Sequence, residues 1–166
     1  NKADISADGT AVSETTSETE PEISDDLPEA DYDGYEFKIL TRDADHHIKE
    51  VYSTELNGEV VNDSVYARNR AVEERFNIEI KSVQVPESDE STLTKFITKS
   101  VMANDLSFDL GLAHTVYAGA AALEGVLFNW HDMEYINFEK PWWNSVLADE
   151  LTVKGHLFLA VSDMCI

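Results

Sequence analysis

The sequence contains a single cysteine, Cys165, so no disulfide can form within the chain. It also lacks an uninterrupted apolar run of about 18 residues, the length that a membrane-spanning helix requires. Basic residues are few, since 12 lysines and arginines stand against 33 aspartates and glutamates, which gives a net charge of −21. A surface this acidic repels phosphate backbones and anionic lipids, so we do not expect nucleic acid as a partner.

Aromatic residues are absent from the first 31 positions, where acidic residues are concentrated. Residues 1–33 hold eleven acidic residues and one lysine, a net charge of −10. A segment rich in serine, threonine and glutamate cannot bury enough apolar surface to offset the entropy lost on ordering. We therefore predict a disordered acidic tether over 1–32 and one folded α/β domain over 33–166. The alternative is an acidic tail that binds a partner or calcium.

Apolar patterns predict three consecutive strand-plus-helix units in the folded part of the chain. The first two predicted strands alternate apolar and polar residues, and the third is mostly apolar, as expected of a strand buried on both faces. The first helix is expected to begin at Asn62 or Asp63 and to bury Val65, Val72 and Phe76, and the second to begin at Ser88 or Asp89. The strands are predicted over 35–43, 77–85 and 108–114, and the helices over 62–77, about 89–103 and 115–125.

Beyond residue 125 the pattern is weaker. Residues 126–133 predict a short strand or turn. A helix is expected over 141–151 with Pro141 in its first turn. Residues 151–163 predict two short strands around a Lys154-Gly155 turn.

This order of elements predicts an open, mainly parallel sheet with helices on both faces. Ligands of such sheets bind outside the carboxyl ends of the strands. That rule selects Arg42 and Asp43 after the first strand, Val85 to Ser88 after the second, and His114 to Tyr117 after the third, of which His114 and Tyr117 are the candidates for binding. A carboxylate accepts hydrogen bonds from sugar hydroxyls, with Arg42 beside it to hold it, and a neutral imidazole both donates and accepts. The alternative for Arg42 and Asp43 is a surface ion pair or helix cap. The alternative for His114 and Tyr117 is that they have no role in binding.

Two adjacent tryptophans, Trp142 and Trp143, lie within the string PWWNSVLADEL. Neighbouring residues of a helix point about 100° apart, so we expect one indole to pack inward and the other to face outward. An exposed indole is a flat apolar platform that stacks on sugar rings or cations. The alternatives, in which both fill a core or contact another protein, stay open.

The strings ERFNIEI, SFDLGL, LEGVLFNW and VKGHLFLAV, in this order and spacing, resemble the first lobe of extracellular solute-binding proteins of bacterial ABC importers. The similarity is to the sugar-binding type that includes maltose-binding protein, and it extends over about residues 35–163. It implies a periplasmic-binding-protein-like type II fold, of which the chain forms an incomplete N-terminal lobe. It also implies that one indole of the tryptophan pair forms part of the cleft wall, and that Asp163 lies near the hinge to a second lobe and contributes to the ligand site. The alternative for Asp163 is a position without a role.

The resemblance implies that the protein binds a carbohydrate or similar small polar solute between two lobes and delivers it to an ABC permease. The strings GEVVNDSVYARNRAVEERFN and PWWN are similar to surface lipoproteins of Gram-positive gut anaerobes. They imply an extracellular parent protein held to the membrane by an N-terminal lipid anchor, whose cysteine and signal peptide are not in this chain. An isolated lobe would expose an apolar cleft wall and a sheet edge, so the alternative is a self-associating interaction domain.

Catalytic signatures are missing from the sequence, which contains no GxSxG, P-loop, GxGxxG, HExxH or CxxC motif. The pairs His46-His47 and His131-Asp132 lack the convergent spacing of a metal site. We therefore expect no enzyme activity, no cofactor and no metal. A hydrolase fragment is a further alternative, and it would require two cleft carboxylates at a catalytic separation.

Overall fold

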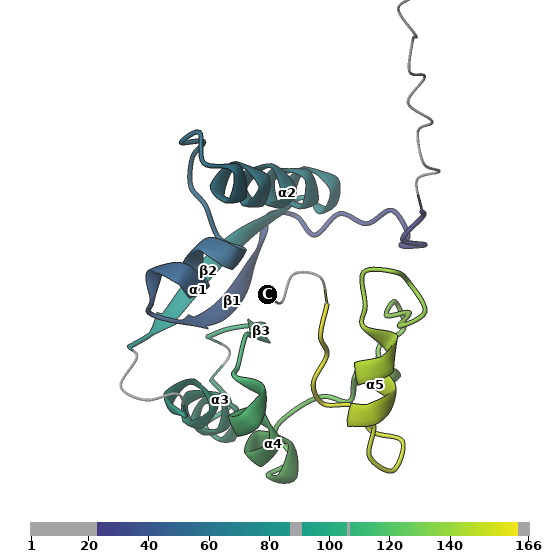
Figure 1. Ribbon diagram of the computed structural model, residues 1–166. Helices are drawn as coiled ribbons and strands as arrows, with labels where there is room; N and C mark the ends of the chain where they lie inside the picture. Colours follow the sequence, from purple (N-terminus) through teal and green to yellow (C-terminus); the bar gives the residue numbers. More distant parts are fainter. Residues whose placement is uncertain (1–22, 87–90, 106, 163–166) are drawn as a thin grey trace, which may run out of the picture.

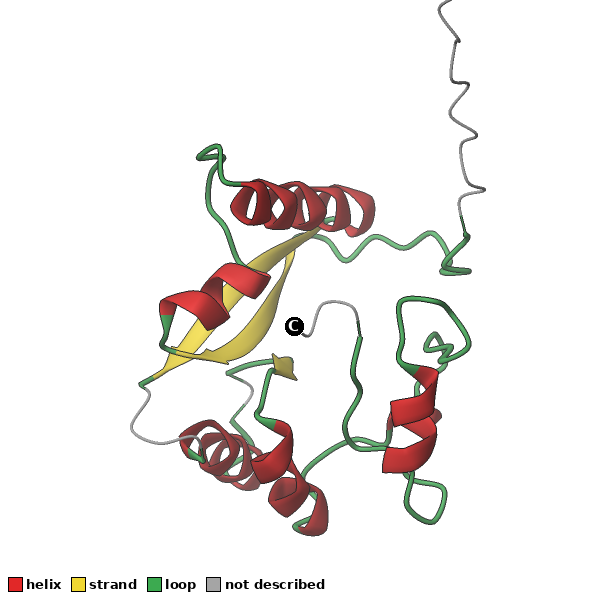
Figure 2. Cartoon of the chain, in the orientation of Figure 1, coloured by secondary structure: helices red, strands yellow, loops and turns green. Residues whose placement is uncertain are grey.

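The computed structural model of the chain describes residues 23–86, 91–105 and 107–162. Within these ranges, five α-helices and one short 3₁₀ helix accompany a small sheet (Figures 1 and 2). None of the described helices combines the length and the apolar character that a membrane span requires. The fold belongs to the α/β class, as the sequence predicts.

Three parallel strands form the sheet, in the order β2-β1-β3. They are β1 (Tyr35–Arg42), β2 (Ile78–Val85) and β3 (Leu110–Gly111). β1 is the central strand and pairs with β2 over its whole length. The predicted parallel arrangement is therefore confirmed.

Helices cover both faces of the sheet. The connection from β1 to β2 contains α1 (Asp45–Val51) and α2 (Val60–Phe76), and the connection from β2 to β3 contains α3 (Thr92–Met102). The fourth helix, α4 (Thr115–Leu123), follows β3 and packs beside α3. Figure 1 shows α1 and α2 on one side of the strands and α3 and α4 on the other.

Side chains of the central strand β1 alternate between the two faces of the sheet, so the core consists of two clusters. Ile39 packs with Ile80 and with Val51 of α1 on one face, whereas Leu40 packs with Leu93 and Ile97 of α3 on the other. Adjacent strand residues point to opposite faces, so one strand serves both layers. Burial of each of these aliphatic side chains stabilises the domain by about 1.5–3 kcal/mol.

The sequence does not predict α1, because its seven residues show no helical periodicity of apolar positions. Tertiary contacts stabilise it. Val51, at its end, is fully buried. The side chain of Asn69 donates a hydrogen bond to the Val51 carbonyl (2.9 Å), and Arg68 donates to the carbonyls of Glu50 and Val51 (3.3 Å each). These bonds satisfy carbonyls that the end of a helix leaves unpaired.

The buried stripe of α2 differs from the predicted one. Val65 is buried as expected, but its companions at the same face are Asn69 and Glu73. Val72 is exposed and Phe76 is half-buried. Hydrogen bonds, rather than apolar contacts, therefore orient much of this helix.

The predicted start of α2 at Asn62 or Asp63 is wrong, since the helix begins at Val60. The carboxylate of Asp63 accepts hydrogen bonds from the backbone N–H groups of Asn57 (2.9 Å) and Gly58 (3.2 Å). It organises the preceding loop instead of capping the helix. The bond from Asn57, followed by that from the Asn62 side chain, lowers the pKa of Asp63 below its ordinary value of 3.8.

Replacing Asp63 with asparagine is expected to flatten the loss of stability in acid. A carboxyl whose pKa is lower in the folded state stabilises the fold above its unfolded pKa and loses that contribution as the pH falls through its folded pKa. Urea unfolding should therefore show a steeper fall in stability for the unsubstituted protein than for Asp63→Asn as the pH is lowered below about 4. Asp149→Asn, on an exposed part of the chain, serves as the control. Equal slopes for the parent and Asp63→Asn would contradict this assignment.

Helix α3 follows its predicted pattern of buried residues more closely than α2 does. Leu93, Ile97 and Ser100 are buried as predicted, while Phe96 is half-buried and Val101 is exposed. The helix begins after Ser91, and the predicted caps Ser88 and Asp89 lie outside the described residues.

β3 is much shorter than predicted, and its two residues are half-buried rather than enclosed. Backbone bonds from Asp109 to Lys38 and from Leu112 to Leu40 extend its attachment to β1 (2.9 Å each). The carboxylate of Asp109 also accepts from the backbone N–H of Lys38 (2.8 Å) and from the Tyr35 hydroxyl (2.6 Å). Among the described strands β3 has no neighbour on its other side, so it is an edge strand.

Gly125 lies just beyond α4, which ends at Leu123 with Glu124 as its C-cap, two residues before the predicted end. It follows the helix with φ +70° and donates to the Ala122 carbonyl, while Val126 donates to that of Ala121. Glycine adopts this left-handed conformation without steric penalty.

The segment after α4 contains the 3₁₀ helix η1 (Trp130–Asp132) and α5 (Ser145–Leu151). The prediction that the last helix starts at Pro141 is wrong. Its N-cap is Asn144, whose side-chain oxygen accepts from the backbone N–H of Leu147 (3.0 Å). The predicted turn at Lys154-Gly155 is present, although the flanking pairing is limited to a single bridge.

The described end of the predicted tether, residues 23–32, lies against the domain. Asp25 forms an ion pair with Arg75, in the last turn of α2, and Asp26 forms one with Lys140 (2.5 Å). These bonds to the cations lower the pKa values of both carboxyls. The remainder of the predicted tether, residues 1–22, lies outside the described residues.

Candidate functional site

The strand order creates a switch point between β1 and β3. From β1 the chain crosses to β2 on one side and then returns to β3 on the other, and the helices that follow β1 and β3 lie on opposite faces of the sheet. In open α/β sheets, ligands bind at such a point. Leu40 is paired with Gly111, and Asp43 and His114 each follow three residues later. We call the surface formed by Arg42, Asp43, His114 and Tyr117 the switch-point rim.

Arg42, the last residue of β1, is half-buried and donates a hydrogen bond to Nε2 of His47 in α1. A guanidinium has no acceptor, so this nitrogen of His47 accepts and carries no proton. The contact fixes α1 against the end of the central strand. His47 contacts the rim through Arg42, and the sequence interpretation considered it only as part of an adjacent histidine pair for metal binding.

Asp43 continues the sheet by one hydrogen bond, from its backbone N–H to the carbonyl of Val85 (2.9 Å). Its side chain is exposed and has no hydrogen bond or ion pair within the described part of the chain. An exposed carboxylate at the end of a central strand is able to accept two hydrogen bonds from a ligand.

His114 is the N-cap of α4, and its Nδ1 accepts from the backbone N–H of Val116 (3.4 Å). The proton of the neutral ring therefore resides on Nε2, which is a donor. The ring centroid lies 5.7 Å from that of Tyr117, which is half-buried. Together the rim offers a carboxylate acceptor after β1 and an imidazole donor after β3.

Trp143 packs inside an aromatic cluster of the C-terminal segment. Its ring centroid lies 5.9 Å from that of Trp130 and 5.1 Å from that of Phe138. Its backbone forms a bridge with Ser162. Trp143 is half-buried, as Trp142 is, and its aromatic contacts come from within the C-terminal segment.

Trp142 is half-buried and lies under the ammonium group of Lys140, which is 6.0 Å from the ring centroid. Because Asn144 caps α5, both tryptophans precede the helix, and the helical geometry expected for them does not apply. Lys140 in turn donates to the carbonyl of Ser24 (2.7 Å).

The structure does not bring the tryptophan pair together with the switch-point rim. The pair is linked through Lys140 and Asp26 to residues 23–32, which we call the N-terminal arm. Asp25 of this arm contacts Arg75, shortly before β2 begins. Arg75 therefore marks the amino-terminal end of the sheet, whereas the switch-point rim lies at the carboxyl end. The eight residues of β1 separate the two ends by roughly 26 Å. Figure 1 shows the segment with α5 lying apart from α1 and α3. Asp163 lies outside the described residues.

Metal-binding geometry is not evident in the part of the chain that the structure describes, where no three histidine, cysteine, aspartate or glutamate side chains are grouped. His131 instead bonds to the hydroxyl of Thr152 (3.0 Å) and packs edge-on against Phe138.

No protein-family model, curated protein or solved structure matches the chain.

Proposed function

We propose that the domain binds a small polar solute, a carbohydrate or a molecule of similar chemistry, at the switch-point rim. The observation that carries this proposal is the parallel order β2-β1-β3, which places Asp43 and His114 after the two strands that flank the switch point. The Asp43 carboxylate accepts from ligand hydroxyls, and Nε2 of His114 donates to a ligand oxygen.

The rim is an exposed surface, since Asp43 and His114 are both exposed. This openness suits one wall of a cleft that closes when a second lobe meets it. On the strength of the sequence resemblance, the proposal extends to the whole domain as the first lobe of a solute-binding protein of an ABC importer, with a type II periplasmic-binding-protein-like architecture. In that proposal the parent protein is an extracellular lipoprotein that passes its solute to a permease, and it has no catalytic role.

Titration calorimetry with a panel of neutral oligosaccharides tests the proposal. Asp43→Asn and His114→Ala are each expected to weaken binding at least about tenfold, because a hydrogen bond to a charged or well-oriented group is lost. Asp149→Asn and His156→Ala change the same residue types at exposed positions elsewhere and should leave the affinity unchanged.

The variant Trp142→Ala separates the two ends of the sheet. Its affinity should match that of the unsubstituted chain, since this indole lies at the opposite end. Loss of binding on Trp142→Ala with full binding by Asp43→Asn would move the site to the tryptophan segment and contradict the proposal.

A further inference from the structure

The helix α4 is apolar on every side. Its sequence, TVYAGAAAL, contains no charged residue. Ala118 and Ala121 are buried against the rest of the domain, yet Val116 and Leu123, on the outer side, are 76% and 92% exposed. Helices that are apolar all round are normally buried on all sides. The outer side of α4 therefore has the composition of an interface.

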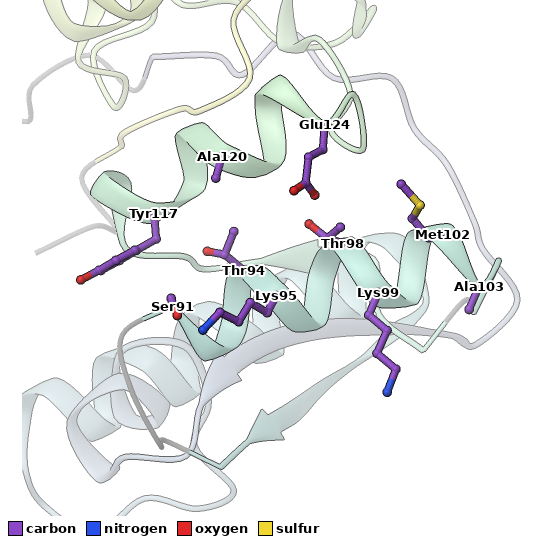
Figure 3. Close-up of a pocket in the computed structure, with 10 residues that line it drawn as sticks. All are labelled: Ser91, Thr94, Lys95, Thr98, Lys99, Met102, Ala103, Tyr117, Ala120 and Glu124. Atoms are coloured by element: carbon purple, nitrogen blue, oxygen red, sulfur yellow. The ribbon is translucent and has the colours of Figure 1, made fainter.

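A groove of about 690 Å³ runs between α3 and α4, which lie side by side and point the same way (Figure 3). Most of its lining residues are exposed, so the groove is open along its length. Small-molecule sites, by contrast, enclose most of the ligand surface. An open groove between two helices suits a third helix. The lining residues are Ser91, Thr94, Lys95, Thr98, Lys99, Met102, Ala103, Tyr117, Ala120 and Glu124.

The α3 residues that line the groove include two lysines and no acidic residue. Residues 91–104 contain Lys95 and Lys99 and no acidic residue, whereas the chain carries −21. The two lysines are one helical turn apart and therefore share a face. Glu124 points from α4 toward Thr98 (Figure 3), so the far end of the groove is acidic.

We infer that the α3–α4 groove docks an amphipathic helix of a partner polypeptide. The apolar face of that helix covers Val116, Ala120 and Leu123, and its carboxylates lie beside Lys95 and Lys99. A second copy of the chain is disfavoured as the occupant, because two molecules of charge −21 repel one another. This inference does not depend on solute binding at the switch-point rim.

Two synthetic helical peptides with the same apolar stripe, flanked by glutamate in one and by lysine in the other, test the inference against the full chain. Fluorescence anisotropy at physiological salt should show at least about tenfold tighter binding of the glutamate peptide. The comparison is stringent, since the net charge of the chain favours the lysine peptide. The double variant Lys95→Glu, Lys99→Glu should reverse the preference.

Leu123→Asp should weaken binding of the glutamate peptide at least about tenfold through loss of apolar contact. Val60→Asp, at an equally exposed valine of α2, is the matched control and should bind as the unsubstituted chain does. Equal binding of the two peptides, or binding that survives both groove variants, would overturn the inference. So would a dimer in sedimentation equilibrium that Leu123→Asp dissociates, which would make a second copy the occupant.

Discussion

Replacing Glu73 with alanine is expected to destabilise the domain by about 2–3 kcal/mol. Glu73 is buried in α2, and its Oε1 accepts a hydrogen bond from the backbone N–H of Ile80 in β2 (2.7 Å). Its Oε2 forms an ion pair with Arg70, although it accepts no well-directed hydrogen bond. β2 is an edge strand, so the carboxylate satisfies an N–H group that no other described strand meets.

The neighbouring residue provides the control for this prediction. Glu74 is exposed on the same helix, and Glu74→Ala should change the free energy of unfolding by less than about 0.5 kcal/mol. Glu73→Gln keeps an acceptor for Ile80 but removes the charge, so its effect should lie between the two. Urea denaturation measures all three. Equal effects of the alanine changes at positions 73 and 74 would contradict the role given to Glu73.

Replacing Gly111 with alanine is expected to destabilise the domain by about 1–2 kcal/mol through overpacking. A Cβ atom at this position of β3 would lie 2.9 Å from Cδ1 of Ile97, in α3. Ile97 is itself buried, so its side chain has little room to move away. The glycine thus permits the close approach of α3 to the third strand.

A double-mutant cycle tests that contact. Ile97→Val removes Cδ1 and alone costs about 1 kcal/mol. Combined with Gly111→Ala, it should cost about 1 kcal/mol less than the sum of the two single changes. Gly119→Ala is the control, because its Cβ would meet nothing within 4 Å and alanine favours a helix. Strictly additive costs at positions 97 and 111 would show that β3 and α3 do not meet as described.

Much of the sheet could be predicted because its determinants are local. Alternation in YEFKIL places Ile39 and Leu40 on opposite faces, and the apolar pattern of α3 predicts its buried Leu93 and Ile97. The positions of Asp43 and His114 after their strands follow from the same pattern together with the rule for parallel sheets.

Other features depend on contacts between distant residues and could not be predicted. Helix α1 is held by Arg68 and Asn69, which lie in the next helix, and β3 pairs with β1 over only two residues. Glu73 is buried because an edge N–H group lies opposite it, whereas an apolar-stripe interpretation assigns that place to Val72.

The tryptophan pair illustrates the limit for the candidate site. Asn144 was a recognisable N-cap signal, and it would have excluded Trp142 and Trp143 from the helix. Their distance from the switch-point rim, however, depends on the contacts of Lys140 with the N-terminal arm. A periodic pattern of apolar residues does not predict such contacts.

The most direct test of solute binding at the switch-point rim is a two-dimensional ¹H–¹⁵N NMR titration of the chain with a neutral oligosaccharide. The amides of Asp43, Ala44, His114 and Thr115 are expected to shift in a saturable manner, while those of residues 140–144 stay in place. Saturable shifts confined to residues 140–144, or to α3 and residues 118–123 of α4, would contradict binding at the rim.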